Sequence, residues 1–355
     1  MKNRLNAVRR RLEDQRADAV LMSFLPDIRW ACGFTGSNGL LFVGDDTAHF
    51  LSDGRYAAQA HREVRHASVH IPDGSLLEYA AEHQLLPSDS AVLFQADHVT
   101  VAKRDKLGDY VPSINWQPVT SLLVEDIAAK DASEIEHIQA AQAITDDVFD
   151  HLCTVVEPGM TERAIAAEIV YQHLKRGAER MAFDPIVASG PNGALPHARP
   201  TNRKLQRGDL VVIDMGGVVD GYASDMTRTV AIGSASDEAC THYTAVLEAQ
   251  RRAIDTIHAG MTGAELDSTA RHVLDDAGLG QYFTHSLGHG IGLQTHEWPR
   301  LSQRVEHVLP EGATVTIEPG VYMPDQHGIR IEDIVVVREE GCDNLTGAPK
   351  HLIEL

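Results

Sequence analysis

Short apolar runs, separated by polar turn residues, dominate the first third of the chain. Leu5, Val8 and Leu12 recur at helical spacing in a polar segment, which predicts a surface helix. Four later runs have the composition and length of strands. They are DAVLMSF (18–24), LLFVG (40–44), AHFLSD (48–53) and SAVLFQA (90–96). We therefore expect an α/β domain over residues 1–124.

The pattern changes near residue 133, where a long helix is predicted to begin. Ser133 precedes Glu136 by three residues, which is the spacing of a capping box, and isoleucines follow at helical spacing. We place a linker at 125–132 and a second domain at 133–355.

The second domain contains an approximate internal repeat. Gly-Met-Thr occurs at 159–161 and again at 260–262, each time between two amphipathic helix patterns. The triplet is expected to supply a turn and the N-cap of the following helix. A strand-like stretch with histidine follows each helix pair. Unless the match is due to chance, it indicates two α+β halves with pseudo-two-fold symmetry and a cleft between them.

The segment DMGGVVDGYASDM has the pattern of a β-hairpin. Asp220-Gly221 is the signature of a type I′ turn. With that turn, Gly216 lies opposite Asp225, and Asp214 is the diagonal neighbour of Asp225 on the same face, roughly 7–8 Å away. A one-residue slip in register would separate the two carboxylates. Side by side, they can reach a common cation, and without one they repel each other.

Further acids follow near the C-terminus. The apolar strand 315–317 ends in Glu318, and a later strand carries Arg330 and Glu332 two residues apart, hence on one face. A single acid at a strand end is ordinarily a solvated cap. Four such acids in one domain, together with a histidine-rich segment, favour a metal site instead.

That histidine-rich segment is THSLGHGIGLQTHEWP, which contains His285, His289 and His296. Its glycines disfavour a stable helix and allow the backbone to approach a ligand closely. We expect an extended or looped segment whose imidazoles converge.

The candidate ligands offer only oxygen and nitrogen donors. Such a set suits hard to borderline divalent ions, and the lack of cysteine argues against a purely structural zinc site. Five ligands with four negative charges exceed what one catalytic ion takes, so two ions bridged by carboxylates are expected. The five are Asp214, Asp225, His289, Glu318 and Glu332.

With these five residues in this order, the chain resembles the M24 metallopeptidases of the pita-bread fold. This family includes methionine aminopeptidase, aminopeptidase P, prolidase and the metal-free creatinase. The likeness covers about 130–355 through DMGGVVDGYASDMTRT, GHGIGLQTHEWP, IEPGVY and GIRIEDIVVV, in that order. GFTGSNGLLFV and SDGRYAAQA resemble the creatinase-type N-terminal domain, which methionine aminopeptidases lack. FTGS followed by DGRY is more similar to a short aminopeptidase P than to a typical prolidase.

The resemblance implies an α+β protein with an α/β N-terminal domain and a pita-bread catalytic domain. It implies a homodimer and two divalent ions, manganese first, with cobalt or zinc as alternatives. Asp225 and Glu332 would bridge both ions, Asp214 would bind one, and His289 and Glu318 the other. A metal-bridging hydroxide would attack the carbonyl, while Glu318 would act as general base and pass the proton to the proline nitrogen.

The remaining site residues also follow from the resemblance. His197 and His296 would stabilise the tetrahedral intermediate and hold the scissile amide, and His285 would lie near the leaving-group pocket. Arg330 would hold ligand carboxylates or contact substrate, with a surface ion pair as the alternative. The resemblance therefore implies a metallo-exopeptidase that removes the residue before proline from peptides.

Other functions are left open by the residues. A prolidase restricted to Xaa-Pro dipeptides is the nearest alternative, because motifs do not show whether the cleft is closed beyond proline. A creatinase-type amidinohydrolase and a catalytically silent pita-bread module that binds peptides or proteins are further alternatives. Intact ligands and histidines argue against both.

Composition limits the expected binding partners and the cellular compartment. The formal net charge of −20 argues against a polyanion such as nucleic acid as partner. No apolar run is long enough to cross a membrane, no signal peptide is recognisable, and the four cysteines form no CxxC pair. We therefore expect a cytoplasmic protein with reduced thiols.

Two features of the N-terminal part carry further expectations. The linker places Glu125 and Asp126 where relatives have a basic residue, which is expected to affect domain packing and to leave the site untouched. Arg55 and Tyr56 are interpreted as contacts to a partner subunit or as anchors of the N-terminal domain.

Overall fold

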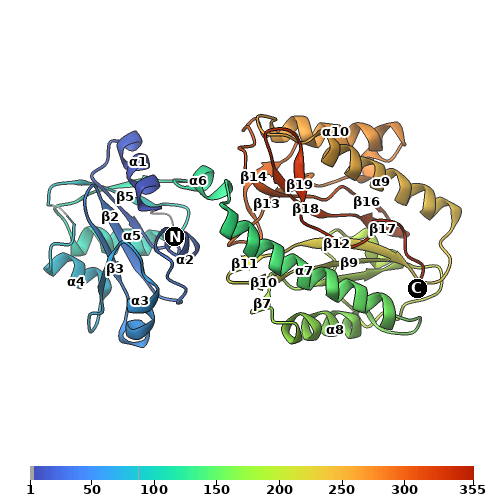
Figure 1. Ribbon diagram of the computed structural model, residues 1–355, viewed down its shortest axis with the longest axis horizontal. Helices are drawn as coiled ribbons and strands as arrows, with labels where there is room; N and C mark the ends of the chain where they lie inside the picture. The colour runs from blue at the N-terminus through green and yellow to red at the C-terminus, as the bar shows by residue number, and fades with distance from the viewer. Residues whose placement is uncertain (1–3, 87) are drawn as a thin grey trace. The chain divides into compact units, whose positions relative to one another are not determined.

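The computed structural model describes residues 4–86 and 88–355, and the chain divides into two compact units, Met1–Ile127 and Ala128–Leu355 (Figure 1). This division falls inside the segment 125–132 that the sequence marks as a linker. We refer to the two parts as the N-terminal and C-terminal units and describe each by itself.

The N-terminal unit contains a six-stranded sheet of order β4-β3-β2-β1-β5-β6. Its strands are β1 (Ala19–Met22), β2 (Leu40–Gly44), β3 (Ala48–Leu51), β4 (Ser68–His70), β5 (Ala91–Gln95) and β6 (Asn115–Val119). Its helices are α1 (Leu5–Gln15), α2 (Leu25–Cys32), α3 (Ala57–Glu63), α4 (Leu76–Glu82) and α5 (Val101–Tyr110), and α6 (Val124–Ala128) follows. The four predicted strands are confirmed, whereas the sequence did not predict β4 and β6.

Helix α1 forms for the predicted reason. Leu5, Val8 and Leu12 lie on one face and are all fully buried. In the same unit, Arg55 is largely exposed and pairs with Asp53, whose Oδ1 accepts from Arg55 Nε at 2.8 Å. The Tyr56 hydroxyl contacts Ser37. Arg55 and Tyr56 of the DGRY motif therefore both have partners within the N-terminal unit.

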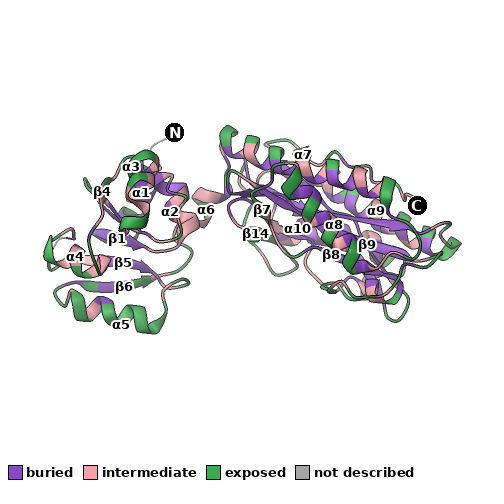
Figure 2. Ribbon diagram, turned by 90° about the horizontal axis from the view of Figure 1, so that it is seen from below, coloured by how far each residue is buried: buried purple, intermediate pink, exposed green. Residues whose placement is uncertain are grey.

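The C-terminal unit places helices outside short, buried strands (Figures 1 and 2). Its helices are α7 (Ala132–Val155), α8 (Glu162–Lys175), α9 (Asp237–Thr256) and α10 (Gly263–Asp276). One sheet has the order β12-β9-β8, another the order β14-β13-β15-β18-β19, and the strands β16 and β17 pair separately. Their bounds are β8 (Ile186–Ser189), β9 (Leu210–Met215), β12 (Met226–Ala231), β13 (Gly288–Gly290), β14 (Glu297–Leu301), β15 (Thr314–Ile317), β16 (Gly320–Met323), β17 (His327–Arg330), β18 (Asp333–Val337) and β19 (Cys342–Asn344). A further small sheet contains β7 (Arg180–Met181), β10 (Gly217–Val219) and β11 (Tyr222–Ala223).

The two Gly-Met-Thr segments have the same local structure. Thr161 caps α8 and Thr262 caps α10, and Gly159 and Gly260 adopt φ values of 94° and 90°. Each glycine N–H donates to a leucine carbonyl from a later segment at 2.9 Å, Leu205 in the first half and Leu309 in the second. This repeated backbone pairing agrees with the predicted duplication of α+β halves, and the α+β fold with an N-terminal α/β unit is confirmed.

The predicted hairpin and its register are confirmed. Asp220 and Gly221 both have positive φ, 45° and 74°, as a type I′ turn requires. Next to the turn, Val219 of β10 pairs with Tyr222 of β11. Farther from the turn, Asp214 of β9 pairs with Thr227 of β12 in the same register. Asp225 is therefore placed diagonally to Asp214, although the strand pairing is interrupted between the pair β10–β11 and the pair β9–β12.

The predicted start of the long helix is wrong by two residues. The N-cap of α7 is Asp131, whose carboxylate accepts from the backbone N–H groups of Ser133 and Glu134. Glu134 completes the box by accepting from the Asp131 N–H at 2.9 Å. An acid at N-cap with a glutamate three residues later satisfies both ends of the box, so Ser133 lies inside the helix and does not cap it.

The strand predicted to carry both Arg330 and Glu332 is also wrong. β17 ends at Arg330 and pairs with β16, whereas β18 begins at Asp333 and pairs with β15. The chain therefore leaves one sheet for another at Ile331 and Glu332. The two side chains still meet, because Thr227 Oγ1 accepts from Arg330 Nε at 3.0 Å and donates to Glu332 Oε2 at 2.7 Å.

Candidate metal centre

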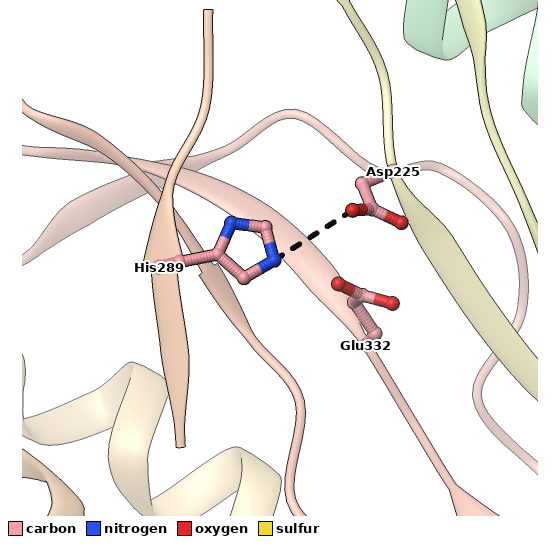
Figure 3. A group of neighbouring side chains, drawn as sticks. All are labelled: Asp225, His289 and Glu332. Atoms are coloured by element: carbon pink, nitrogen blue, oxygen red, sulfur yellow. Dashed lines mark ion pairs between the residues drawn. The ribbon is translucent and has the colours of Figure 1, made fainter. Parts of the chain in front are cut away.

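Three donor side chains meet inside the C-terminal unit, and Figure 3 shows them converging from separate segments. Asp225 lies immediately before β12, His289 in β13, and Glu332 between β17 and β18. One ligand atom of each lies within 4.8 Å of the others. His289 Nε2 is 3.8 Å from Asp225 Oδ2 and 3.4 Å from Glu318 Oε1. Glu318 therefore belongs to the same group.

The fifth predicted ligand, Asp214, lies in β9 and is paired with a buried arginine. Arg330 Nη2 donates to Asp214 Oδ2 at 2.7 Å, so the surface ion pair considered for Arg330 is wrong. The other oxygen, Asp214 Oδ1, is buried and has no hydrogen-bond partner among the residues that the structure describes. A buried acceptor without a partner costs about 1–3 kcal/mol, and a cation at this place would remove that cost.

The electrostatics of the group also fit a cation. Burial raises the pKa of Glu318 to about 8. Burial, followed by repulsion between neighbouring acids, raises the pKa values of Asp225 and Glu332 well above their usual range. Burial lowers the pKa of His289 to about 4, which keeps the imidazole neutral, the form that binds metals. Crowded carboxylates and one neutral imidazole fit a divalent metal ion.

The glycines around His289 let its strand pass very close to its neighbours. A Cβ at Gly288 would lie 2.0 Å from the Thr316 carbonyl oxygen, and one at Gly290 would lie 2.3 Å from the Trp298 oxygen. His289 Nδ1 donates to the Gly290 carbonyl at 3.0 Å, which leaves Nε2 facing the acids. The predicted extended segment is confirmed as β13, and its glycines are required by close backbone packing.

A buried tyrosine links the arginine to a second predicted histidine. Tyr322 in β16 accepts from Arg330 Nη1 at 2.7 Å, and its hydroxyl lies 2.9 Å from His285 Nε2. Burial lowers the pKa of His285 to about 4, so the ring is neutral. Sequence reasoning assigned no role to Tyr322, because a tyrosine in a β-type run has the pattern of an ordinary strand residue.

The other two predicted histidines lie near this group. The His296 ring packs edge-on against His289, with centroids 4.3 Å apart. Burial, followed by the charge of Arg300, lowers the pKa of His296. His197 is exposed, and its charge contributes to lowering the pKa values of both His285 and His296. Contacts therefore tie His285 and His296 to the site, through Tyr322 and His289 respectively, whereas the role of His197 stays a prediction.

The loop that carries His197 is held by a buried carboxylate that the sequence did not reveal. Glu162, at the start of α8, is fully buried. Its oxygens accept from the backbone and hydroxyl groups of both Ser189 and Thr201 and from the Asn192 amide. These donors flank His197 on both sides. A glutamate in the first turn of a helix has the pattern of a solvated residue, and only the fold brings its partners together.

Substitution of Glu162 by Gln is expected to lower the unfolding free energy at pH 7 by about 1.5–3 kcal/mol, the range for hydrogen bonds to a charged group. Burial acts to raise the pKa of Glu162, but hydrogen bonds from Thr201 and Ser189 outweigh it, so the pKa lies below its usual range. The carboxylate therefore stabilises the fold above the unfolded pKa, and this contribution is lost as pH falls through the folded pKa.

Urea unfolding of both proteins between pH 7 and pH 3 tests this expectation. The gap between wild type and Glu162→Gln should close as the pH falls through the acid range. The exposed Glu157, five positions earlier, provides the control, since Glu157→Gln should leave the curve unchanged. A gap that stays constant with pH would show that the charge of Glu162 contributes nothing.

Glu125 and Asp126 both pair with Arg11, which agrees with the expectation that these two acids leave the site untouched, but another linker residue contacts the histidine-rich segment. Asp126 pairs with Arg11 inside the N-terminal unit, with 2.6 Å between Oδ2 and Nε. Lys130, however, donates from Nζ to Glu297 Oε2 at 2.9 Å, and the two side chains are 0% and 4% exposed. Glu297 directly follows His296. A buried ion pair thus ties the segment before α7 to the histidine-rich segment.

A duplicated α+β fold that brings buried carboxylates and a histidine to one place defines a metalloenzyme of the pita-bread class. Residues 136–339 match Metallopeptidase family M24, and residues 4–127 match the Creatinase/Prolidase N-terminal domain. The chain belongs to metallopeptidase family M24 and is a metallo-exopeptidase.

Several relatives resemble the chain along most of its length. Uncharacterized peptidase YqhT of Bacillus subtilis is 37% identical over 338 residues, 95% of this chain and 96% of the relative. The Xaa-Pro dipeptidase of Pyrococcus furiosus is 46% identical over 224 residues, 63% of this chain and 64% of the relative. The solved structure of Xaa-Pro dipeptidase from Bacillus anthracis has a TM-score of 0.96 at 34% identity, with 99% of both chains covered. That of X-Pro aminopeptidase from Thermotoga maritima has a TM-score of 0.92 at 34% identity, covering 99% of this chain and 100% of the other.

Among the residues that the structure describes, no helix has the length and apolar content that crossing a bilayer requires.

Proposed function

We propose that this protein hydrolyses the bond between an N-terminal residue and a following proline, as an aminopeptidase P, with two divalent metal ions. The buried group of four carboxylates and one neutral imidazole supports the metal requirement. Relatives with the names Xaa-Pro dipeptidase and X-Pro aminopeptidase support the substrate class. Manganese is the first choice of ion, and the homodimer and cytoplasmic location stay predictions.

Five side chains would hold the ions. They are Asp214, Asp225, His289, Glu318 and Glu332. Divalent ions in such a site supply Lewis acidity that polarises a carbonyl and lowers the pKa of water. Two neighbours orient the ligands, since Arg330 donates to Asp214 and Thr227 donates to Glu332.

The protein's own groups move the proton and hold the substrate. Glu318 accepts the proton of the nucleophile and delivers it to the leaving proline nitrogen. His296 and His197 donate to the oxygen that becomes negative in the tetrahedral intermediate, and His285 lies toward the leaving group, fixed by Tyr322. As in any amide cleavage, the proline nitrogen must receive this proton before it can leave as a neutral amine.

The test is metal-dependent cleavage of three peptides. We expect the protein stripped by a chelator to be inactive, and manganese to restore cleavage of Ala-Pro-Ala to Ala and Pro-Ala by mass spectrometry. Ala-Ala-Ala, which lacks proline, is the matched control and should remain intact. If no peptide is cut with two metal equivalents bound, the proposed substrate class is wrong.

A dipeptidase is the second candidate, because the Bacillus anthracis structure with a TM-score of 0.96 is named as one. The same experiment separates the two functions. Cleavage of Ala-Pro without cleavage of Ala-Pro-Ala would identify a dipeptidase, whereas cleavage of the tripeptide supports the aminopeptidase.

A further inference from the structure

The acids of the metal centre differ in how their carboxylates are held. Asp214 accepts from Arg330 and Glu332 accepts from Thr227, each at 2.7 Å. Within residues 4–86 and 88–355, the structure gives the Asp225 carboxylate no hydrogen-bond donor, and its polar contact is the His289 ring at 3.8 Å. The position of Asp225 must therefore be set by the backbone on which it lies.

That backbone is anchored at the preceding residue, Ser224. The Ser224 N–H donates to the Gly217 carbonyl at 2.9 Å, and Ser224 Oγ accepts from the Gly217 N–H at 2.9 Å. The two segments touch so closely that a Cβ at Gly216 would lie 2.0 Å from the Ser224 carbonyl oxygen. Ser224 thus closes the interrupted ladder of the hairpin directly beside Asp225.

The Ser224 hydroxyl continues into a chain of buried hydrogen bonds. Ser224 Oγ lies 2.8 Å from Thr145 Oγ1 in α7, and Thr145 Oγ1 lies 3.1 Å from His173 Nε2 in α8. His173 Nδ1 lies 2.9 Å from the Ile169 carbonyl. Ser224, Thr145 and His173 are each fully buried. We call these three residues the relay.

The hydrogen bonds of the relay have one consistent direction. The Ile169 carbonyl can only accept, so His173 Nδ1 carries the hydrogen and Nε2 is an acceptor. Thr145 must then donate to Nε2, and its oxygen accepts from the Ser224 hydroxyl. The competing acceptors are farther away: the Ala141 carbonyl lies 3.3 Å from Thr145 Oγ1, and the Gly217 carbonyl lies 3.2 Å from Ser224 Oγ. Burial also lowers the pKa of His173, which keeps the imidazole ring neutral, so that Nε2 carries no hydrogen and can accept.

The imidazole also contacts the hairpin itself. A Cβ at Gly217 would lie 2.9 Å from His173 Cδ2, so the ring packs directly against the backbone that pairs with Ser224. The relay therefore connects two helices, α7 and α8, to the one point where the hairpin ladder is interrupted.

We propose that Thr145, His173 and Ser224 are positioning residues that fix the backbone of Asp225 for metal binding. This inference rests on the proposed role of Asp225 as a metal ligand. Removing one hydroxyl leaves a buried imidazole or hydroxyl without its partner. The backbone at Asp225 then shifts, and the affinity of the site for metal falls. Loss of an outer partner of a metal ligand ordinarily costs about 10–100-fold in affinity.

The experiment compares Thr145→Val, which has nearly the same shape without the hydroxyl, with Thr145→Ser, which retains it. The control is Thr154→Val on the same helix, where the exposed hydroxyl donates to the His151 carbonyl. Isothermal titration of the metal-free full-length proteins with Mn²⁺ gives the affinities. We expect Thr145→Val to bind about 10–100-fold more weakly, and Thr145→Ser and Thr154→Val to bind as wild type does.

A second readout reports the geometry of the ligands. The visible absorption bands of bound Co²⁺ should change in Thr145→Val and not in Thr154→Val. If Thr145→Val does not fold, Ser224→Ala removes the other hydroxyl of the relay and should weaken Mn²⁺ binding by the same range. Folded variants that bind Mn²⁺ as tightly as wild type, with unchanged Co²⁺ bands, would overturn the relay.

The same titration separates this inference from the proposed function. A wild-type protein that binds Mn²⁺ but cleaves no Xaa-Pro peptide refutes the substrate class, and the binding comparison still decides the relay. A wild-type protein that binds no divalent ion refutes both.

Discussion

Replacing Glu318 by Gln is expected to lower kcat/KM for Ala-Pro-Ala by about 10²–10⁴-fold, the usual contribution of general acid–base catalysis. Glutamine has nearly the shape of glutamate but cannot take up a proton, so the nucleophile and the leaving nitrogen both lose their proton carrier. The residue follows β15 directly, and Glu318 Oε1 lies 3.4 Å from His289 Nε2. Because the amide oxygen can still coordinate, loss of activity should exceed loss of metal.

The measurement is therefore steady-state kinetics at saturating Mn²⁺, together with the metal content of each protein. The exposed Glu311, which lies just before β15, provides the matched control as Glu311→Gln. That variant should retain full activity. If Glu318→Gln keeps its metal and loses less than about tenfold in kcat/KM, another group is the base. If metal and activity vanish together, the variant reports ligation and leaves the base to be identified.

The features that the sequence predicts well are set by local chemistry. Asp220-Gly221 specifies a turn with two positive φ values, and the turn fixes the register that places Asp214 diagonally to Asp225. The two Gly-Met-Thr segments likewise specify a left-handed glycine and a threonine cap. In each case, neighbouring residues in the chain decide the geometry.

In the N-terminal unit, the two strands that the sequence did not predict are the edges of the sheet, β4 and β6. An edge strand needs no continuous apolar pattern, because it has a neighbouring strand along only one of its two edges and its other edge faces solvent. β6 even contains Pro118, which lacks the N–H of a ladder hydrogen bond and is tolerated at an edge.

The parts of the site that the sequence did not predict depend on contacts between distant segments. The Tyr322 hydroxyl forms hydrogen bonds with Arg330 and His285. The Glu162 carboxylate accepts hydrogen bonds from residues before and after His197 in the chain. Neither the tyrosine of a strand nor the glutamate of a helix start reveals its partner, because only the folded chain brings the groups together. The N-cap of α7 shows the same limit on a smaller scale. The sequence offers two overlapping capping boxes, Ser133 with Glu136 and Asp131 with Glu134, and the structure forms the second.

Lys130 is the strongest case of such a distant contact, and removing its charge is expected to destabilise the protein. Substitution by Met should lower the free energy of unfolding by about 3–5 kcal/mol, because Glu297 would remain as a buried charge without its ion-pair partner. Both side chains are almost completely buried, and Gly292 lies so close that a Cβ there would meet Lys130 Cε at 2.6 Å. Water therefore has little room to replace the ammonium group.

The double variant Lys130→Met/Glu297→Gln distinguishes lost charge pairing from lost packing. Glutamine removes the uncompensated charge while its oxygen can still accept from the Gln294 N–H, which donates to Glu297 Oε1 at 2.9 Å in the wild type. We expect the double variant to recover most of the stability in urea unfolding. The exposed pair Arg252–Glu248 is the control, and Arg252→Met should cost less than about 1 kcal/mol. A double variant as unstable as Lys130→Met would assign the loss to packing of the lysine stem. Recovery of stability without recovery of kcat would show that the ion pair also holds His296, the residue before Glu297, in its place for catalysis.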